Sequence, residues 1–380
     1  MIKLNNLKLD NSIITGFSNF DNVDIDFPYD YTGFSDFFKE KARISDGKRK
    51  RPKIDPDMIG LVGIFDPSLL DFLAMLDGKS CRRLSDKTQV FTACENSNVR
   101  NRLTHTFEVV SLSTRIAKIL GLNIFMAMAI ALGHDLGHVP FGHDGEKVLS
   151  ELSGKNFNHG TFSVVLAQEI ERKGNGLNLT RDTLNGILYH SSGDKEVEID
   201  ESLPLEFGTV KYADKISYLF ADIQDIFRMK CDCNLAELEK MLAFFGKTQR
   251  ERVAKCLFHL VKESCEENKI SFKYSDTAKK FSELKNWMYQ NVYKKISNKD
   301  FCRSAIVFLY NALRPICNQI QIDPIIFIAL MTDRDVISFA SQMFHKPLLQ
   351  MGDFANVGAM EIAEHIRGKT IDFTNPGLDW

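Results

Sequence analysis

Residues 123–137, NIFMAMAIALGHDLG, constrain the fold of this chain more than any other stretch. The segment is apolar on every side of a helix up to Gly133, so a helix formed here has no face that prefers water. It then ends in His134 and Asp135, whose side chains are costly to bury unless they are paired or bind a metal. The sequence therefore predicts a buried helix, enclosed by other elements, with a polar site at its end.

Most of the chain after Pro67 also has a helical pattern. Residues 104–120 are expected to form a helix that ends at Gly121, with one apolar side made of Phe107, Val110, Leu112, Ile116 and Ile119. Further amphipathic segments lie near 161–172, 181–190, 208–229, 235–246, 248–264, 276–294, 300–321, 324–330, 333–344 and 358–367. Only residues 195–200, KEVEID, alternate in a way that fits a small hairpin or a loop. The pattern predicts an all-α fold.

We expect three parts along the chain: an irregular N-terminal segment at 1–50, a helical body at 51–345, and a C-terminal helix and tail at 346–380. The basic run at 46–53, DGKRKRPK, fits a solvated loop, with a phosphate or nucleic-acid contact as the alternative. The tail, IDFTNPGLDW, either docks on a neighbouring subunit or is a loose end.

The composition is that of a soluble globular protein, with 380 residues, a formal net charge of −2 and 44% hydrophobic residues. This charge gives no general attraction to nucleic acid or to a membrane. No apolar run has the length needed to span a bilayer, and the N-terminus lacks the features of a signal peptide, so we expect a cytoplasmic protein. Eight cysteines without a CxxC pair argue against a disulfide scaffold, and Cys231 and Cys233 are expected to be reduced thiols.

Two histidines and two aspartates form a candidate metal site: His105, His134, Asp135 and Asp214. They come from three helical segments, and metal sites in helical proteins are built from facing helices. Two neutral imidazoles and two carboxylates carry a charge that matches a divalent cation. Nitrogen and oxygen ligands without thiolate favour Mn²⁺, Fe²⁺, Co²⁺, Ni²⁺ or Mg²⁺ over a structural zinc site. Simple packing is the alternative, but five of the nine histidines lie between residues 105 and 159.

The succession H…HD…D resembles the HD superfamily of metal-dependent phosphohydrolases. Seven blocks follow in order: CRRLSDKTQVF (81–91), RLTHTFEV (102–109), ALGHDLGHVPFGHDGEKVL (131–149), FNHGTFS (157–163), GLNLTRDTLNGILYH (176–190), YADKISYLFADIQD (212–225) and MTDRD (331–335). Together they are similar to the dGTPase-like family of deoxynucleoside triphosphate triphosphohydrolases, over roughly residues 50–340. The resemblance implies an HD-domain helical fold with a buried site for one divalent metal ion, and extra segments at both ends.

The resemblance also implies roles for individual residues. The metal ligands would be His105, His134, Asp135 and Asp214, and the catalytic residues would be His143 and Glu146, with His138 beside them. Arg102 and Lys215 would contact the phosphates, and Tyr218 and Asp222 would lie near the phosphates and the sugar. Gln89 would contact the 3′-hydroxyl, and His159 would be a further histidine of the active site. Gly160 and Phe162 replace polar residues that are usual in the family.

The implied reaction is hydrolysis of a dNTP, either dGTP or several dNTPs, to a deoxynucleoside and inorganic triphosphate. The implied partners are a dNTP effector and further copies of the chain, in a dimer, tetramer or hexamer. One alternative is an HD phosphohydrolase that acts on another nucleotide, such as a deoxynucleoside monophosphate or a cyclic dinucleotide. A regulator that senses nucleotides or binds nucleic acid is the other alternative, supported by the basic run and by Gly160 and Phe162.

Overall fold

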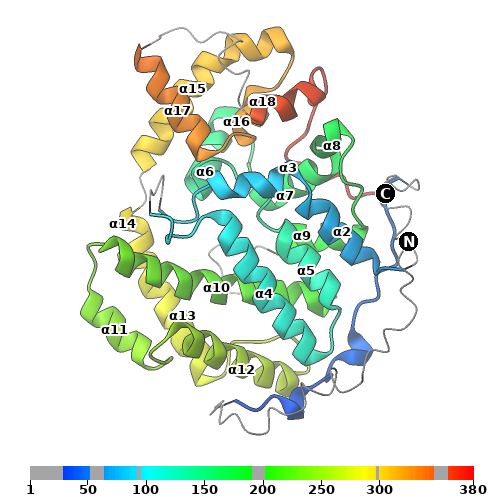
Figure 1. The fold of residues 1–380 in the computed structure, drawn as a ribbon, viewed down its shortest axis with the longest axis vertical. Coiled ribbons are helices and arrows are strands. Elements are labelled where there is room, and N and C mark those ends of the chain that lie inside the picture. Colours follow the sequence, from blue (N-terminus) through cyan, green and yellow to red (C-terminus); the bar gives the residue numbers. More distant parts are fainter. Residues whose placement is uncertain (1–28, 52–63, 92–95, 191–201, 297–298, 346–357) are drawn as a thin grey trace, which may run out of the picture.

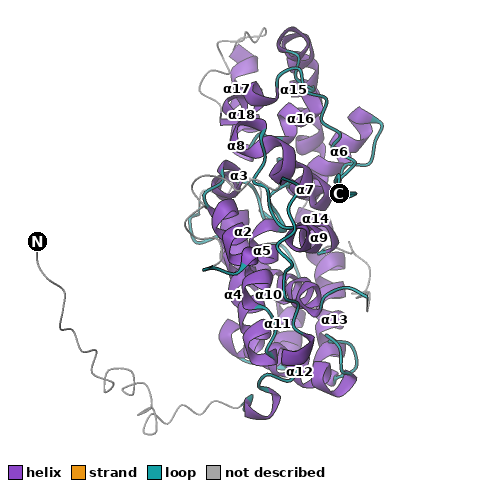
Figure 2. Cartoon of the chain, turned by 90° about the vertical axis from the view of Figure 1, so that its right-hand side faces the viewer, coloured by secondary structure: helices purple, strands orange, loops and turns teal. Residues whose placement is uncertain are grey.

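The computed structural model describes residues 29–51, 64–91, 96–190, 202–296, 299–345 and 358–380. Within these ranges there are helices and loops but no strand, as Figure 2 shows, and β-type pairing is confined to two isolated bridges. The predicted all-α fold is therefore confirmed. The alternating segment at 195–200 lies outside the described residues.

Three helices form the centre of the molecule: α4 (Arg102–Leu120), α5 (Ile124–Gly133) and α10 (Leu205–Met229). They pack against one another, and seven of the ten residues of α5 are buried, while Phe125 in its first turn is 39% exposed. Asparagines at the N-caps start two of these helices, since the side chains of Asn101 and Asn123 accept backbone N–H groups of the first turns. The predicted buried helix is therefore present, and Figure 1 shows it between α4 and α2.

The remaining helices surround this centre. They are α2 (Pro67–Leu76), α3 (Lys79–Arg83), α6 (Gly142–Ser153), α7 (His159–Val165), α8 (Glu171–Gly174), α9 (Arg181–Tyr189), α11 (Leu235–Ala243), α12 (Gln249–Glu267), α13 (Asp276–Met288), α14 (Lys294–Ile296), α15 (Lys299–Ile320), α16 (Pro324–Ala329), α17 (Asp333–His345) and α18 (Gly358–Ala363). The molecule is elongated, with α15 to α18 at one end and α11 to α13 at the other (Figures 1 and 2). Each end has its own apolar cluster, and α6 belongs to the cluster that contains α15.

The apolar side of α4 agrees with the predicted one only in part. Leu112 and Ile116 are buried as expected, but Phe107 is 44% exposed, and His105 and Val109 are buried as well. The prediction for Phe107 was wrong because the face turned toward α5 and α10 includes His105, a polar residue that apolar periodicity alone does not count.

The described part of the N-terminal segment, residues 29–50, lies against the helical body. Phe38 is fully buried, and its N–H group donates to the carbonyl of Leu120 at 2.8 Å. The basic run is not simply a solvated loop, because the Arg49 guanidinium lies 2.6 Å from the carboxylate of Asp71, which is completely buried. A buried carboxylate needs a counter-charge, and Arg49 supplies it. Residues 52 and 53 of this run lie outside the described residues.

The C-terminal tail packs on its own chain, so it is not a loose end. Phe373 is buried and stacks on Phe157, with ring centroids 5.2 Å apart. At the very end, the indole N–H of Trp380 donates to Gln168 at 3.2 Å. Aromatic side chains bury a large apolar area, and here that area covers the core beside α6 and α7. Among the described residues, no helix is both long and apolar enough to cross a membrane.

Candidate active site

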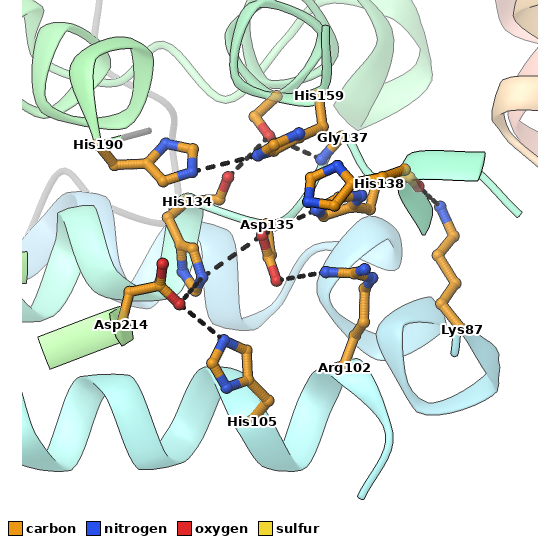
Figure 3. Close-up of polar contacts among 12 residues, drawn as sticks. Lys87, Arg102, His105, His134, Asp135, Gly137, His138, His159, His190 and Asp214 are labelled. Atoms are coloured by element: carbon orange, nitrogen blue, oxygen red, sulfur yellow. Dashed lines mark hydrogen bonds and ion pairs between the residues drawn. The ribbon is translucent and has the colours of Figure 1, made fainter. Parts of the chain in front are cut away.

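The four predicted metal ligands lie together where α4, α5 and α10 meet (Figure 3). The nearest ligand atoms of His105, His134 and Asp135 all lie within 4.8 Å of one another. The Asp214 carboxylate is 3.1 Å from Nε2 of His105 and 4.0 Å from Nε2 of His134. The Asp214 side chain is 24% exposed while the other three are nearly inaccessible, so the cluster opens to solvent on the side of Asp214.

The tautomer of His134 is fixed by the end of α5. Its Nδ1 lies 2.7 Å from the carbonyl oxygen of Ala131, so Nδ1–H donates there and Nε2 keeps its lone pair. That Nε2 atom is buried and has no hydrogen-bond partner, although two carboxylates lie near it. A buried nitrogen with a free lone pair and nearby carboxylate oxygens together make a set of donor atoms that binds a divalent cation. The residues present therefore fit a metal ion.

Asp135 is shared between this cluster and two neighbouring side chains. Its Oδ2 atom accepts from Arg102 at 2.8 Å, and its Oδ1 atom lies 3.2 Å from Nε2 of His138. Burial alone would raise the pKa of Asp135, but the neighbouring His134, His138 and Arg102 outweigh it and hold that pKa well below the ordinary value. Asp135 is therefore ionised, as a metal ligand must be.

The loop after α5 turns the chain back toward the cluster. Gly137 lies so close to α7 that a Cβ atom there would be 2.2 Å from the backbone nitrogen of Ser163. Phe141 and Gly142 then have φ angles of +63° and +59°. Two successive left-handed residues reverse the chain direction, and α6 begins at once, which places His143 in its first turn.

A second polar group is centred on Glu146. Its Oε1 atom lies 2.9 Å from Nδ1 of His159, 3.3 Å from Nδ1 of His143 and 3.2 Å from Nδ1 of His138, the last without hydrogen-bond geometry. Burial would raise the pKa of Glu146, but the charge of His159 and the histidine hydrogen bonds lower it well below normal. The His143 side chain is 67% exposed, so this group also has an open side.

His159 carries protons on both ring nitrogens. The Nδ1 atom of His190 is 2.6 Å from the carbonyl of Ile187 and donates there, so Nε2 of His190 can only accept. That acceptor lies 3.3 Å from Nε2 of His159, whose Nδ1 donates to Glu146. Burial would lower the pKa of His159, but Glu146 outweighs it and raises that pKa. The sequence singled out His190 only weakly; its position at the end of a family block was the available signal.

His138 connects the two groups. It touches Asp135 on one side and stacks on His159 with ring centroids 3.9 Å apart. Burial and the charge of Arg102 lower the pKa of His138 to about 3, so its ring is neutral. The ligand cluster and the Glu146 group are therefore contiguous, as Figure 3 shows for His138 and its neighbours.

The predicted substrate residues fall into two sets. Arg102 and His159 are part of the network above, and Lys215 is buried on α10 next to Asp214. Gln89 has a buried Oε1 atom without a hydrogen-bond partner, and no contact among the described residues joins it to the ligand cluster.

The other set is already paired within the protein. Asp222 is buried and accepts from the Tyr293 hydroxyl at 2.8 Å, and Tyr218 shares a hydrogen bond with Tyr289. Burial raises the pKa of Asp222 to about 7, against the opposing effect of the Tyr293 hydrogen bond. The two partner tyrosines were missed, because they lie on a segment that resembles none of the family blocks.

Gly160 and Phe162 are accommodated without polar partners. Phe162 is completely buried in the apolar cluster with Phe157, so it does not point toward the polar group. A Cβ atom at Gly160 would lie 3.5 Å from the His190 ring. Neither substitution disturbs the contact between His159 and Glu146.

Comparison with known proteins agrees with this geometry. Residues 102–219 match the HD domain family. A deoxyguanosinetriphosphate triphosphohydrolase-like protein from Clostridium tetani is 37% identical over 247 residues, which is 64% of this chain and 70% of the relative. The chain belongs to the dGTPase-like family of HD-domain proteins. Proteins of the same description from Clostridium perfringens (34% identical over 255 residues, 74% of the relative) and Geobacter metallireducens (46% over 156 residues, 40% of the relative) are also similar.

The part of the chain that matches the HD domain can be compared with the residues of the candidate site. The HD domain match contains the four ligand residues and the Glu146 group, whereas Gln89 and α15 to α18 lie outside it. HD domains are metal-dependent, which agrees with the free lone pair of His134. The HD-domain core therefore carries the ligand cluster, and flanking segments complete its surroundings.

Proposed function

We propose that this protein hydrolyses a deoxynucleoside triphosphate to a deoxynucleoside and inorganic triphosphate. The observation that carries the proposal is the position of His138, which touches both Asp135 of the ligand cluster and the Glu146 group. A metal-binding cluster directly beside an acid–base group is the arrangement that phosphoester hydrolysis requires. The names of the relatives make dGTP the first substrate to test.

His105, His134, Asp135 and Asp214 would hold the metal ion. When bound, such an ion polarises a phosphoryl oxygen and lowers the pKa of water. Lys215 lies buried next to Asp214 with its charge available for the triphosphate. Arg102 holds Asp135 in the ionised form and lies beside the same cluster. These two cations neutralise the charge that builds up as the phosphate reacts.

In the proposed reaction, the oxygen of a water molecule bonds to the α-phosphorus and the bond from that phosphorus to the 5′-oxygen breaks. The water proton goes to solvent or to a nearby base, and the 5′-oxygen takes a proton to leave as a hydroxyl. We assign that second proton to His143, because its ring is exposed on the open side and Glu146 orients it through Nδ1. His159, protonated between Glu146 and His190, keeps the Glu146 carboxylate in place.

The oxygen atom of Gln89 supports recognition of the sugar. It is a buried acceptor without a partner among the described residues, and an acceptor of this kind is matched by a sugar hydroxyl. Asp222 and Tyr218 are already paired with tyrosines, so we propose that they shape the pocket wall together with Tyr289 and Tyr293.

The proposal is tested by incubating the full chain with Mn²⁺ or Mg²⁺ and each dNTP, and by separating the products. A deoxynucleoside and inorganic triphosphate are expected in equal amounts. Release of a deoxynucleoside monophosphate with pyrophosphate, or no triphosphate from any dNTP, contradicts the proposal. A panel of deoxynucleoside monophosphates and cyclic dinucleotides in the same assay identifies a different nucleotide substrate.

A further inference from the structure

Asp333, the first residue of α17, holds two segments that are distant in the sequence. Its side chain is buried, with 3% of the residue exposed. One carboxylate oxygen accepts the backbone N–H of Thr88 at 3.0 Å, and the other accepts the backbone N–H of Phe141 at 2.9 Å. The carboxylate therefore fixes these two backbone positions relative to each other.

Each of the two segments carries part of the proposed active site. Thr88 directly precedes Gln89, and Phe141 lies between His138 and His143. The ammonium group of Lys87 also donates to the carbonyl oxygen of His138, as Figure 3 shows. The loop that runs from His138 to Phe141 is thus held at its first end by Lys87 and at its last by Asp333, which also holds Thr88.

The loop needs such support because its backbone is unfavourable. Phe141 has a φ angle of +63°, a conformation that costs free energy in any residue with a Cβ atom. Such conformations persist where surrounding contacts determine them. The hydrogen bond from Phe141 N–H to Asp333 is one of these contacts, and the burial of the Phe141 ring is another.

A carboxylate suits this position better than an amide. The groups that face Asp333 are two backbone N–H donors and the hydroxyl of Thr88, so both carboxylate oxygens are needed as acceptors. Asparagine offers one acceptor oxygen and one NH₂ donor, and the donor would face a backbone N–H group. The buried Lys87 side chain lies nearby as a counter-charge.

We propose that Asp333 is a positioning residue that sets the spacing between the sugar-binding segment at Gln89 and the loop carrying His138 and His143. Through this contact α17, which lies outside the HD domain match, controls the geometry of the site. The inference rests on the proposed function for its effect on turnover. The contact itself is independent of that function.

The test compares Asp333→Asn with Asp335→Asn in the full chain. Asp335 is two residues away on the same helix and accepts the N–H of Thr332 at 2.8 Å, whereas the N–H groups of Thr88 and Phe141 donate to Asp333. A displacement of about 1 Å at reacting groups can cost roughly 100-fold in rate, so kcat of Asp333→Asn is expected to fall by about 10- to 100-fold. Its preference for a dNTP over the matching 2′,3′-dideoxynucleotide, which lacks the 3′-hydroxyl, is expected to weaken, while metal content stays unchanged. Asp335→Asn is expected to keep wild-type kcat and preference.

Amide hydrogen exchange gives a readout that does not depend on activity. In the wild-type protein, the amides of Thr88 and Phe141 are expected to exchange slowly although both lie outside helices. In Asp333→Asn both are expected to exchange faster, with the rest of α6 unchanged. Asp333→Glu keeps both acceptor atoms and is expected to recover part of the lost turnover.

Three results overturn the inference. The first is fast exchange of either amide in the wild-type protein, which would remove the contact whether or not the variants fold. A second is faster exchange in Asp333→Asn without any loss of kcat or of sugar preference. The third is an equal loss in Asp335→Asn. If the wild-type protein releases no triphosphate from any dNTP, the proposed function fails, and the exchange rates alone still decide whether Asp333 holds the loop.

Discussion

His138 is the residue on which the two halves of the site depend. It lies between Asp135 and Glu146, it is neutral, and its Nδ1 atom has no hydrogen-bond partner. The four candidate ligands lie close to one another without His138. We therefore assign it to the reacting groups and not to metal binding.

Replacing His138 with alanine is expected to lower kcat by about 10- to 100-fold, the range for one acid–base or polar contact in a transition state. Metal content, measured by atomic absorption on the purified protein, is expected to stay at the wild-type level. Asp135→Ala is the matched control, since it is expected to lose both metal and activity. Loss of the metal from His138→Ala would show that His138 is itself a ligand.

Asp222 makes the stability of the protein depend on pH. Its folded-state pKa is about 7, above the value of about 4 in an unfolded chain, so the folded protein holds a proton that unfolding releases. This contribution is complete below about pH 4 and is lost as the pH rises through about 7. Asp222→Asn removes it. Between about pH 5 and pH 8, the free energy of unfolding of the variant is expected to rise relative to that of the wild type by on the order of 2 kcal/mol. Urea unfolding at several pH values measures the difference, and parallel curves for the two proteins would contradict it.

Among the elements, the loop between α5 and α6 is the most constrained. A Cβ atom at Gly137 would lie 2.2 Å from the Ser163 nitrogen and 2.6 Å from the His159 carbonyl oxygen, and neither backbone atom can move alone. The loop and α7 therefore have to separate if any side chain is added. Since α7 carries His159, such a separation also moves the Glu146 group.

Gly137→Ala is expected to destabilise the fold by roughly 2 kcal/mol or more, as overpacking of a close backbone contact does. Gly33→Ala is the control, because nothing lies within 4 Å of the added atom, and a change below about 0.5 kcal/mol is expected. Both free energies of unfolding come from urea titrations. Equal stability of the two variants would mean that the loop does not lie against α7.

Most helices could be predicted from the sequence because the apolar repeat of each one is local. The segments at 181–190 and 299–320 each have a clear apolar face, and those at 181–190 and 324–329 start with a threonine cap and a proline, respectively. Contacts between distant segments could not be predicted in the same way. The pair of Arg49 and Asp71 has no local pattern, because only the tertiary fold brings its members together.

The same limit applies to the site. Its ligand residues were found by their resemblance to a family, and they do lie together. Asp333 and Lys87 were missed as contacts of the loop, although both lie within blocks that resemble the family. A lysine or an aspartate in such a block gives no sign of which backbone group it reaches. The tail was missed for the same reason, since an aromatic residue does not indicate the surface on which it packs.

At the scale of the whole molecule, the C-terminal tail closes the apolar cluster beside the active-site helices. Phe373→Ala is expected to destabilise the protein by about 3 kcal/mol, the typical cost of deleting a buried aromatic ring. Phe308→Ala removes a ring that is 45% exposed and is expected to have a much smaller effect. Thermal melting compares the two variants. A tail that is loose in solution would give equal melting temperatures.

The central proposal concerns which bond of the nucleotide breaks, and isotope labelling tests it most directly. The reaction is run in water enriched in ¹⁸O with the metal-loaded protein and dGTP, and both products are analysed by mass spectrometry. Attack of water at the α-phosphorus predicts one ¹⁸O atom in the inorganic triphosphate and none in the deoxynucleoside. Label in the deoxynucleoside, in a monophosphate or in free phosphate would contradict the proposed reaction.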